Sequence, residues 1–244
     1  MSGRNAAPPG RSGAHFLRPR FAAEIVRSTG VGPHDLVLDL GAGLGALTAP
    51  LAATGARVIA VEREPSYARR LTARFADWPG VRVVSADLLA VPRPRRPFGV
   101  VANTPYATTA ALLRRLLDGG VPSLLRADLV VEYGVAKRLT GPPRDGAARR
   151  VAVRNDIQIV RALPPACFRP PPGVTAALVV IRPYPLSPAA ARRLTRLLAL
   201  VDRQPGRAVR KLVPGPVAWR AVGIDPAQPA GSVTPQGWRA LVMG

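Results

Sequence analysis

The 244-residue sequence predicts an α/β fold: a doubly wound, Rossmann-like sheet with a small helical C-terminal domain. Short runs of apolar, β-branched residues alternate with amphipathic stretches over the first half of the chain, a pattern typical of right-handed βαβ units. The turn after the first such run is rich in glycine, as at the ligand-binding edge of these sheets. Beyond residue 186 the sequence changes to arginine-rich helical stretches.

Each element of the first half follows from its local pattern. Residues 21–30 carry apolar side chains at helical spacing and end at Gly30, a residue type common at helix termini. The continuously apolar strands are expected at residues 35–40, 57–62, 81–87 and 98–103. The helices between them are expected at residues 46–55, 65–78 and 108–120.

The second half continues the sheet and then leaves it. Residues 127–139 predict a strand followed by a helix. Residues 155–165 and 175–183 predict two strands that pair antiparallel at the sheet edge. The chain is therefore divided into a flexible basic tail (1–12), an α/β catalytic domain (13–186) and a small helical domain (187–244).

The charge of the chain predicts a polyanionic partner. The formal net charge is +21, from 35 basic and 14 acidic residues, and only Lys137 and Lys211 among the basic residues are lysine. A GC-rich coding bias explains arginine in place of lysine, but it does not explain the excess of bases over acids. Nucleic acid is favoured over a membrane surface because no basic amphipathic helix stands apart from the fold. We expect the helical C-terminal domain to contribute to RNA binding.

The few cysteine and histidine residues exclude several kinds of site. Cys167 is the single cysteine, and His15 and His34 are far apart in the sequence, so neither a disulfide nor a metal site is expected. Residues 1–12 lack the apolar core of a signal peptide, and no 18-residue uncharged apolar run is present. We expect a cytoplasmic, monomeric protein without a membrane partner.

Residues 39–45, DLGAGLG, form the glycine-rich turn. Glycine lets a ligand approach bare backbone amides at the start of a helix, and it also permits close packing of helix on sheet. Either role suits Gly41 and Gly43 taken alone. The spacing is G-x-G-x-G and not the dinucleotide pattern G-x-G-x-x-G, which favours S-adenosylmethionine as the ligand.

Two carboxylates end the next two strands, Glu62 in VIAVE and Asp87 in VVSAD. The carboxyl ends of parallel strands border one crevice, so both acids are expected beside the glycine turn. There Glu62 can accept the ribose hydroxyl protons of the ligand, and Asp87 can accept from its adenine amine. Helix-capping acids are the simpler explanation for either residue alone, but two acids at equivalent strand ends favour a site.

The stretch NTPY places Asn103 at the end of the fourth strand, at the same crevice. The lone pair of an adenine N6 amine is delocalised into the ring, and acceptors on its hydrogens would free that lone pair. The Asn103 side-chain oxygen and the Thr104 carbonyl can be these acceptors. Pro105 stiffens the turn, and Tyr106 offers a ring on which a base can stack. In isolation, an ordinary Asn-x-Pro turn explains the tetrapeptide equally well.

Taken in order, DLGAGLG, VIAVE, SADLL and NTPY resemble the motifs of the rRNA adenine N6-methyltransferases, the group that contains the Erm resistance enzymes and KsgA/Dim. Three further stretches are similar to motifs of that group. They are SGAHFLRPR (12–20), VEYGVAKRLTG (131–141) and CFRPPPGVTAALVVIRP (167–183). The resemblance covers residues 12 to about 183.

The resemblance assigns roles to particular residues. It implies that His15 and Leu17 border the S-adenosylmethionine cofactor and that Phe168 covers the target base. The remaining assignments are that Gly41, Gly43, Glu62 and Asp87 bind the cofactor, that Asn103 contacts both cofactor and base, and that Asn103, Tyr106 and Phe168 are the catalytic set. Two departures stand out: Ala14-His15 replaces the group's Gln-Asn pair, and Thr104 replaces Ile, Leu or Val.

Within the group, the short C-terminal part and the basic LLRRLL after NTPY favour an Erm-type enzyme. Such an enzyme methylates one adenine in the peptidyl-transferase region of 23S rRNA and confers macrolide, lincosamide and streptogramin B resistance. A KsgA/Dim-type enzyme, acting on adenines of small-subunit rRNA, is the alternative. An NAD-dependent dehydrogenase and a noncatalytic RNA-binding module are more remote, since neither explains both the charge and the polar strand ends.

Overall fold

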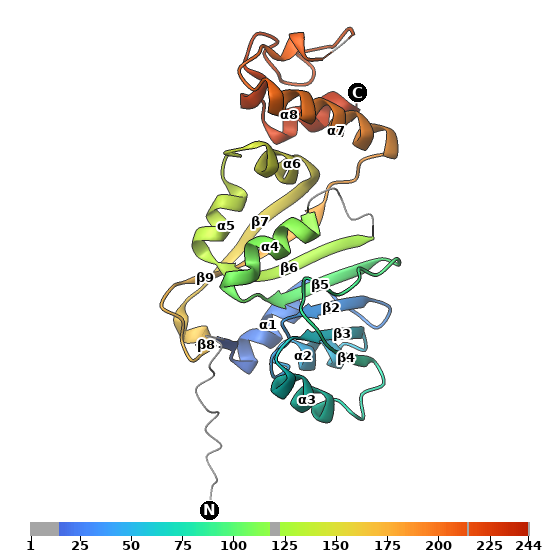
Figure 1. Cartoon of the computed structure of the whole chain (residues 1–244), viewed down its shortest axis with the longest axis vertical. Helices are drawn as coiled ribbons and strands as arrows, with labels where there is room; N and C mark the ends of the chain where they lie inside the picture. Colours follow the sequence, from blue (N-terminus) through green and yellow to red (C-terminus); the bar gives the residue numbers. More distant parts are fainter. Residues whose placement is uncertain (1–14, 118–122, 214, 244) are drawn as a thin grey trace, which may run out of the picture.

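The computed structural model describes residues 15–117, 123–213 and 215–243 (Figure 1). The tail expected at residues 1–12 lies outside the described residues. Within the described part, none of the helices is both long enough and apolar enough to cross a membrane.

A mixed seven-stranded sheet forms the centre of the molecule, in the order β4-β3-β2-β5-β6-β9-β7. Neighbouring strands from β4 to β6 are parallel, and β9 runs antiparallel to both β6 and β7. The predicted strands and the late antiparallel pair at the edge are therefore confirmed. The strands are β2 (Leu36–Leu40), β3 (Arg57–Glu62), β4 (Val81–Ser85), β5 (Phe98–Asn103), β6 (Leu124–Glu132), β7 (Asn155–Leu163) and β9 (Ala176–Pro183).

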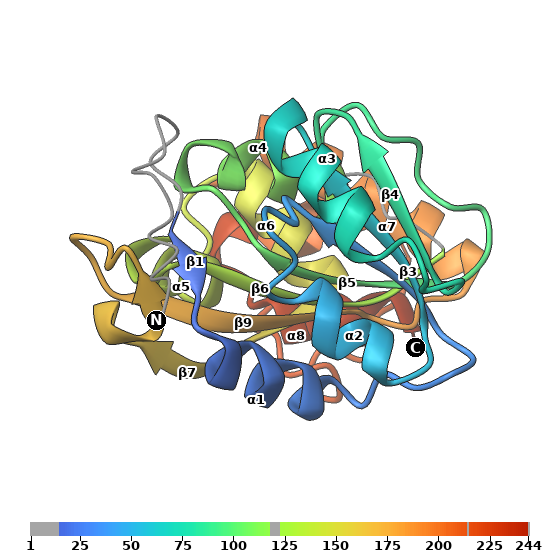
Figure 2. The ribbon, with the colours of Figure 1, turned by 90° about the horizontal axis from the view of Figure 1, so that it is seen from below.

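Helices cover both faces of this sheet (Figure 2). One apolar core joins α1 and α2 to the sheet, and a second joins α4 and α5 to the opposite face. Helix α3 packs against β3 and β4, beside the glycine turn. The helices are α1 (Pro19–Thr29), α2 (Thr48–Ala53), α3 (Pro65–Arg74), α4 (Tyr106–Leu117), α5 (Tyr133–Thr140) and α6 (Gly146–Arg154).

The expected helices are all present, with bounds that differ by up to four residues, and one helix was not expected. Helix α4 begins at Tyr106, two residues earlier than expected, because the chain turns into the helix directly after Pro105. Helix α6 was not predicted. Asp145 caps it by accepting a 2.7 Å hydrogen bond from the backbone N–H of Ala148, and this capping residue was its sequence signal.

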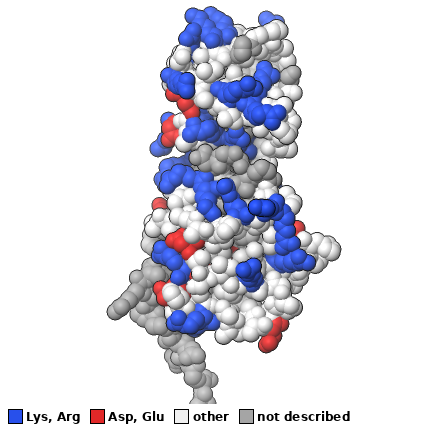
Figure 3. Space-filling model, turned by 45° about the vertical axis from the view of Figure 1, so that its right-hand side comes forward, with Lys and Arg blue, Asp and Glu red and all other residues white. Residues whose placement is uncertain are grey.

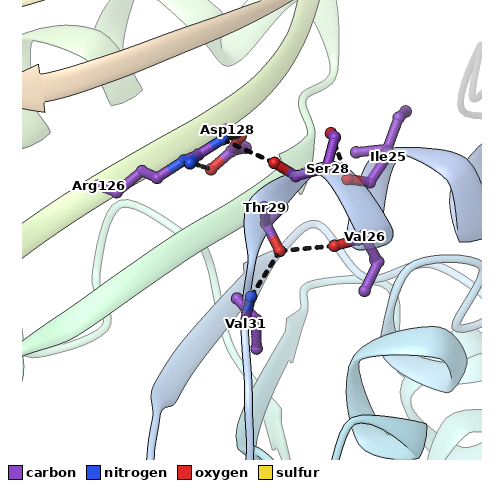
Figure 4. A network of polar contacts seen from close by, with 7 residues as sticks. All are labelled: Ile25, Val26, Ser28, Thr29, Val31, Arg126 and Asp128. Atoms are coloured by element: carbon purple, nitrogen blue, oxygen red, sulfur yellow. Dashed lines mark hydrogen bonds and ion pairs between the residues drawn. The ribbon is translucent and has the colours of Figure 1, made fainter.

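A buried ion pair fastens the end of α1 to β6 (Figure 4). Arg126 donates two 2.7 Å hydrogen bonds to the carboxylate of Asp128, whose residue is only 2% exposed, and a third of 3.2 Å to the carbonyl of Ser28. The Thr29 hydroxyl closes the same helix end by accepting from the N–H of Val31. These contacts hold α1 against β6. Strand β6 pairs with β5, and β5 ends at the predicted catalytic residue Asn103.

The C-terminal helices α7 (Pro188–Arg203) and α8 (Pro235–Met243) lie beyond α6, at one end of the molecule (Figure 1). Their core surrounds the fully buried Trp238 and includes Val153 of α6. Polar contacts reinforce this packing, because Arg239 donates to three backbone carbonyls at the end of α6. The C-terminal helices therefore rest on the α/β part through α6, and the division at residue 186 stays a prediction.

Candidate active site

A cavity of about 330 Å³ opens at the carboxyl ends of the parallel strands. Its walls come from segments far apart in the sequence: the short strands β1 (Phe16–Leu17) and β8 (Phe168–Arg169), the glycine turn, the ends of β3 and β5, and the start of α4. The predicted site residues that line it are His15, Gly41, Gly43, Glu62, Asp87, Asn103 and Phe168.

One predicted residue is placed differently, and another is not described. Leu17 does not line the cavity, because its side chain is 3% exposed and packs in the core formed by α1 and the sheet. Tyr106 opens α4, but its side chain lies outside the described part of the structure. The prediction that its ring stacks on the base stays a prediction.

The glycine turn combines the two roles that the sequence left open. Gly41, Gly43 and Gly45 all have positive φ, at 83°, 56° and 84°. A Cβ at Gly45 would meet Leu71 of α3 and Phe75, the residue after that helix, at 2.8 Å, so this glycine permits packing. Gly41 and Gly43 line the cavity, where the absence of a side chain leaves room beside the backbone, although their N–H groups already donate to Val61 and Glu62.

Glu62 is fixed by backbone donors at the floor of the cavity. One carboxylate oxygen accepts from the N–H of Gly43 and the other from the N–H of Glu64, both at 2.7 Å. The residue is only 8% exposed. Each oxygen has a further lone pair for a ligand hydroxyl, so the carboxylate can bind a diol while it holds the glycine turn in place.

Behind the glycine turn, Asp39 is buried and accepts a 2.6 Å hydrogen bond from the Thr48 hydroxyl. Burial raises the pKa of the Asp39 carboxyl to about 7, the Thr48 hydrogen bond opposes this, and the nearby charge of Glu62 adds to it. Asp39 does not line the cavity. It therefore supports the turn from behind.

Asp87 lies at the rim. One of its oxygens accepts a 2.7 Å hydrogen bond from the N–H of Leu89, and the other lies 3.6 Å from the guanidinium of Arg63. The side chain of Asp87 is 39% exposed, so it can receive a group that enters the cavity. Arg63 was not predicted as a site residue, and its only sequence signal is its position directly after Glu62.

The opposite wall is built from two segments far apart in the sequence, residues 15–17 and 168–170. The side-chain nitrogen of Asn103 donates a 2.7 Å hydrogen bond to the backbone carbonyl of His15, and the His15 ring nitrogen Nδ1 lies 3.0 Å from the carbonyl of Pro170. Strands β1 and β8 pair antiparallel, with Leu17 opposite Phe168. The segment after residue 14 and the loop of Phe168 thus close one side of the cavity together.

An aromatic pair was missed from the sequence. Phe16 and Tyr67 both line the cavity, with their ring centroids 5.7 Å apart in an edge-to-face arrangement. A Cβ at Gly43 would approach the Phe16 ring to 2.7 Å, so the ring lies directly on the glycine turn. Phe16 stands within the motif 12–20, but no local pattern indicates that it meets α3.

Comparison with known proteins identifies the family. The profile described as "Ribosomal RNA adenine dimethylase" matches residues 11–211, most of the chain. The chain belongs to this family. It is an rRNA adenine N6-methyltransferase that uses S-adenosylmethionine, and the dehydrogenase and noncatalytic alternatives are set aside.

Relatives within the dimethylase family carry two kinds of name. The "Ribosomal RNA small subunit methyltransferase A" of Synechococcus sp. (strain RCC307) is 34% identical, over 95% of this chain and 93% of that protein. The "rRNA adenine N-6-methyltransferase" of Bacillus licheniformis is 33% identical, over 71% of this chain and 61% of that protein. Among solved structures, the 23S rRNA methyltransferase ErmE is similar with a TM-score of 0.77 and 25% identity, covering 93% of this chain and 98% of ErmE.

A dimethyladenosine transferase from Plasmodium falciparum shares the fold, with a TM-score of 0.72 and 16% identity. The family resemblance seen in the sequence is thus confirmed at the level of the whole group.

The cavity suits the cofactor of the dimethylase family. Its lining includes two glycines of the turn, the buried Glu62 carboxylate, which can bind a diol, and an apolar wall that contains Phe16, Val61 and Leu88. S-adenosylmethionine has a matching ribose, adenine and methionine.

Proposed function

We propose that this enzyme methylates N6 of adenine in small-subunit rRNA, with the target base held at Asn103. The observation that carries the role of Asn103 is its hydrogen bond to His15. Because a carbonyl can only accept, the nitrogen of the Asn103 amide must face His15, and its oxygen is left for another donor. Asn103 lines the cavity, so an adenine amine that enters there can be that donor.

The bound S-adenosylmethionine supplies a methyl group on a positively charged sulfur. In our proposal Glu62 receives the ribose hydroxyls, and Asp87 receives the amine of the cofactor's adenine. The Asn103 side-chain oxygen and the Thr104 carbonyl accept the two hydrogens of the target amine, which turns its lone pair out of conjugation with the ring. No strong base is needed, because the methylated amine is cationic and loses its proton readily.

An arginine-lined hollow lies beside α4 and is lined by residues close in sequence to those of the cavity. Leu88 lines the cavity and the next residue, Leu89, lines the hollow. On α4, Thr108 lines the cavity and Ala111, one helical turn later, lines the hollow. Arg93, Arg114 and Arg115 complete it. Arg93 and Arg114, both exposed, can bind the phosphates that flank the target adenine, whereas the Arg115 guanidinium donates to the carbonyl of Val91.

Lysine and arginine outnumber the acids on the surface seen in Figure 3, over both the α/β part and the C-terminal helices. Exposed arginines of the C-terminal part, including Arg207 and Arg210, extend the proposed RNA surface.

The choice of the small subunit rests on the extent of similarity. The relative from Synechococcus matches along nearly the whole of both chains, whereas the Bacillus relative matches over a shorter region. A 23S target, which the sequence favoured, is the second candidate, and the similarity to ErmE along almost its whole chain supports it. In that case the methylated base would confer macrolide, lincosamide and streptogramin B resistance.

Mapping of the modified base tests the proposal. Cells lacking their own small-subunit enzyme would express this chain or its Asn103→Ala variant, and reverse transcription would be read along both rRNAs. We expect stops at small-subunit adenines with the wild type alone. Stops confined to 23S rRNA, with acquired macrolide resistance, would transfer the assignment to the second candidate.

A further inference from the structure

Two buried hydroxyl groups form a connected network beneath the NTPY turn (residues 103–106). Thr104 is 2% exposed and Thr109 is 1% exposed, and their Oγ1 atoms lie 3.0 Å apart. The Thr104 hydroxyl donates to the backbone carbonyl of Val130 at 2.9 Å, and the Thr104 N–H reaches the same carbonyl at 3.1 Å. The residue after Asn103 is therefore attached to β6 by both its backbone and its side chain.

A count of hydrogens assigns a direction to this network. The Thr104 hydroxyl has one proton, which the Val130 carbonyl receives, so the hydrogen between the two hydroxyls comes from Thr109. The alternative acceptor for Thr109 is the Pro105 carbonyl, 3.1 Å away. Thr109 has one hydroxyl proton, so it donates either to the Thr104 hydroxyl or to the Pro105 carbonyl. Both acceptors belong to the turn, and either bond ties α4 to it.

The geometry points to Thr104 and Thr109 as positioning residues that hold the Thr104 carbonyl against the adenine amine. This inference rests on the proposed function, in which that carbonyl accepts one amine hydrogen. Acceptors for a transition state act best when surrounding groups fix them beforehand, and a small displacement of the reacting atoms is costly.

Thr109→Val and Thr104→Val remove one hydroxyl each at nearly constant volume. We expect the single-turnover methylation rate of Thr109→Val to fall by about tenfold or more, with the dissociation constants of cofactor and RNA changed less than about twofold. Thr109→Ser, which restores the hydroxyl, should recover the rate to within about threefold of wild type. Thr29→Val is the matched control, because Thr29 is also a buried hydroxyl with two hydrogen bonds, remote from the cavity.

A merely structural role would lower the melting temperature of Thr109→Val and Thr29→Val alike and leave both methylation rates unchanged, which would overturn the inference. Failure of Thr109→Ser to restore the rate would overturn it as well, because the hydroxyl would not be the cause. Asn103→Ala separates the two proposals. If Asn103→Ala methylates more slowly but Thr104→Val and Thr109→Val do not, only the inference fails. If Asn103→Ala methylates at the wild-type rate, the proposed function fails as well.

Discussion

The side-chain amide of Asn103 and the backbone carbonyl of His15, 88 positions apart in the sequence, are joined by a hydrogen bond of 2.7 Å. This bond determines which end of the amide is available to a ligand, since the nitrogen is already used. His15 stands where the Erm and KsgA/Dim group has the second residue of a Gln-Asn pair. Because the backbone of residue 15 makes the contact, the replacement leaves the orientation of Asn103 intact.

Asn103→Ala should lower the single-turnover methylation rate by about 10² or more, as the loss of a transition-state hydrogen bond does. Cofactor binding should remain close to wild type, because Glu62 and the glycine turn are untouched. Calorimetry and rapid-quench methylation measure the two quantities separately.

Asn103→Asp provides a sharper comparison with the alanine variant. An aspartate offers the same acceptor oxygen but places a second oxygen, with no donor, against the His15 carbonyl. The variant should therefore be as impaired as Asn103→Ala. Wild-type rates in Asn103→Asp would show that the contact with His15 does not orient the amide.

Glu62→Ala should weaken S-adenosylmethionine binding by about 1 to 3 kcal/mol, because the ribose hydroxyls lose a charged acceptor. The structure adds a second cause, since the N–H groups of Gly43 and Glu64 lose their acceptor too. Glu62→Gln retains one oxygen and should lie between wild type and alanine. An unchanged dissociation constant in calorimetry would exclude Glu62 from the cofactor site.

Local patterns were enough to predict most of the fold. Continuous apolar runs give the strands of a sheet covered on both faces, and the expected ranges 57–62 and 98–103 coincide with β3 and β5. Glu62, Asp87 and Asn103 follow from the same reasoning, because the carboxyl ends of parallel strands necessarily meet at one edge.

Contacts between distant segments could not be predicted in this way. The pairing of β1 with β8 involves only two residues in each strand, too few for a periodic pattern. Phe16 meets Tyr67 only because that pairing brings residue 16 over the glycine turn. The sequence did not determine the rRNA target: its local motifs favoured 23S rRNA, whereas our proposal of the small subunit depends on similarity to a relative over 95% of the chain.

The aromatic ring of Phe168 can be tested without emptying the core. Phe168 lines the cavity but is only 1% exposed, so Phe168→Ala would leave a hole that costs about 3 to 5 kcal/mol of stability. Phe168→Leu removes the ring and keeps most of the volume. We expect it to weaken base stacking by about 1 kcal/mol or more and to slow methylation.

Phe98→Leu is the control for this substitution, since Phe98 is equally buried and does not line the cavity. If both leucine variants methylate at the wild-type rate, Phe168 serves only to pack the core.

Arg114 and Arg115 are neighbours with different expected roles. Arg114 is exposed, whereas the Arg115 guanidinium donates to the carbonyl of Val91 and so holds the loop before β5. Arg114→Gln should weaken RNA binding and reduce the slope of its salt dependence by about 1, with no change in melting temperature. Arg115→Gln should lower stability by about 1 kcal/mol. RNA affinities at several salt concentrations decide this, and a wild-type slope in Arg114→Gln would remove that residue from the RNA surface.

Asp39 makes the stability of the enzyme depend on pH. Burial raises the pKa of its carboxyl from 3.8 to about 7, so the folded protein keeps a proton that the unfolded chain has already released. The free energy of unfolding should therefore decrease as pH rises from about 4 to about 7, by at most about 4 kcal/mol from this group. Asp39→Asn, which can still accept from Thr48, should lack this decrease.

The free energy of unfolding of wild type relative to Asp39→Asn should thus fall between about pH 4 and about pH 7, the interval in which the unfolded chain has released the proton and the folded carboxyl still holds it, and it should level off above pH 7. Urea unfolding at four pH values measures it, and Asp77→Asn, at an exposed position, is the control. A constant difference across this interval would mean that Asp39 ionises alike in both states.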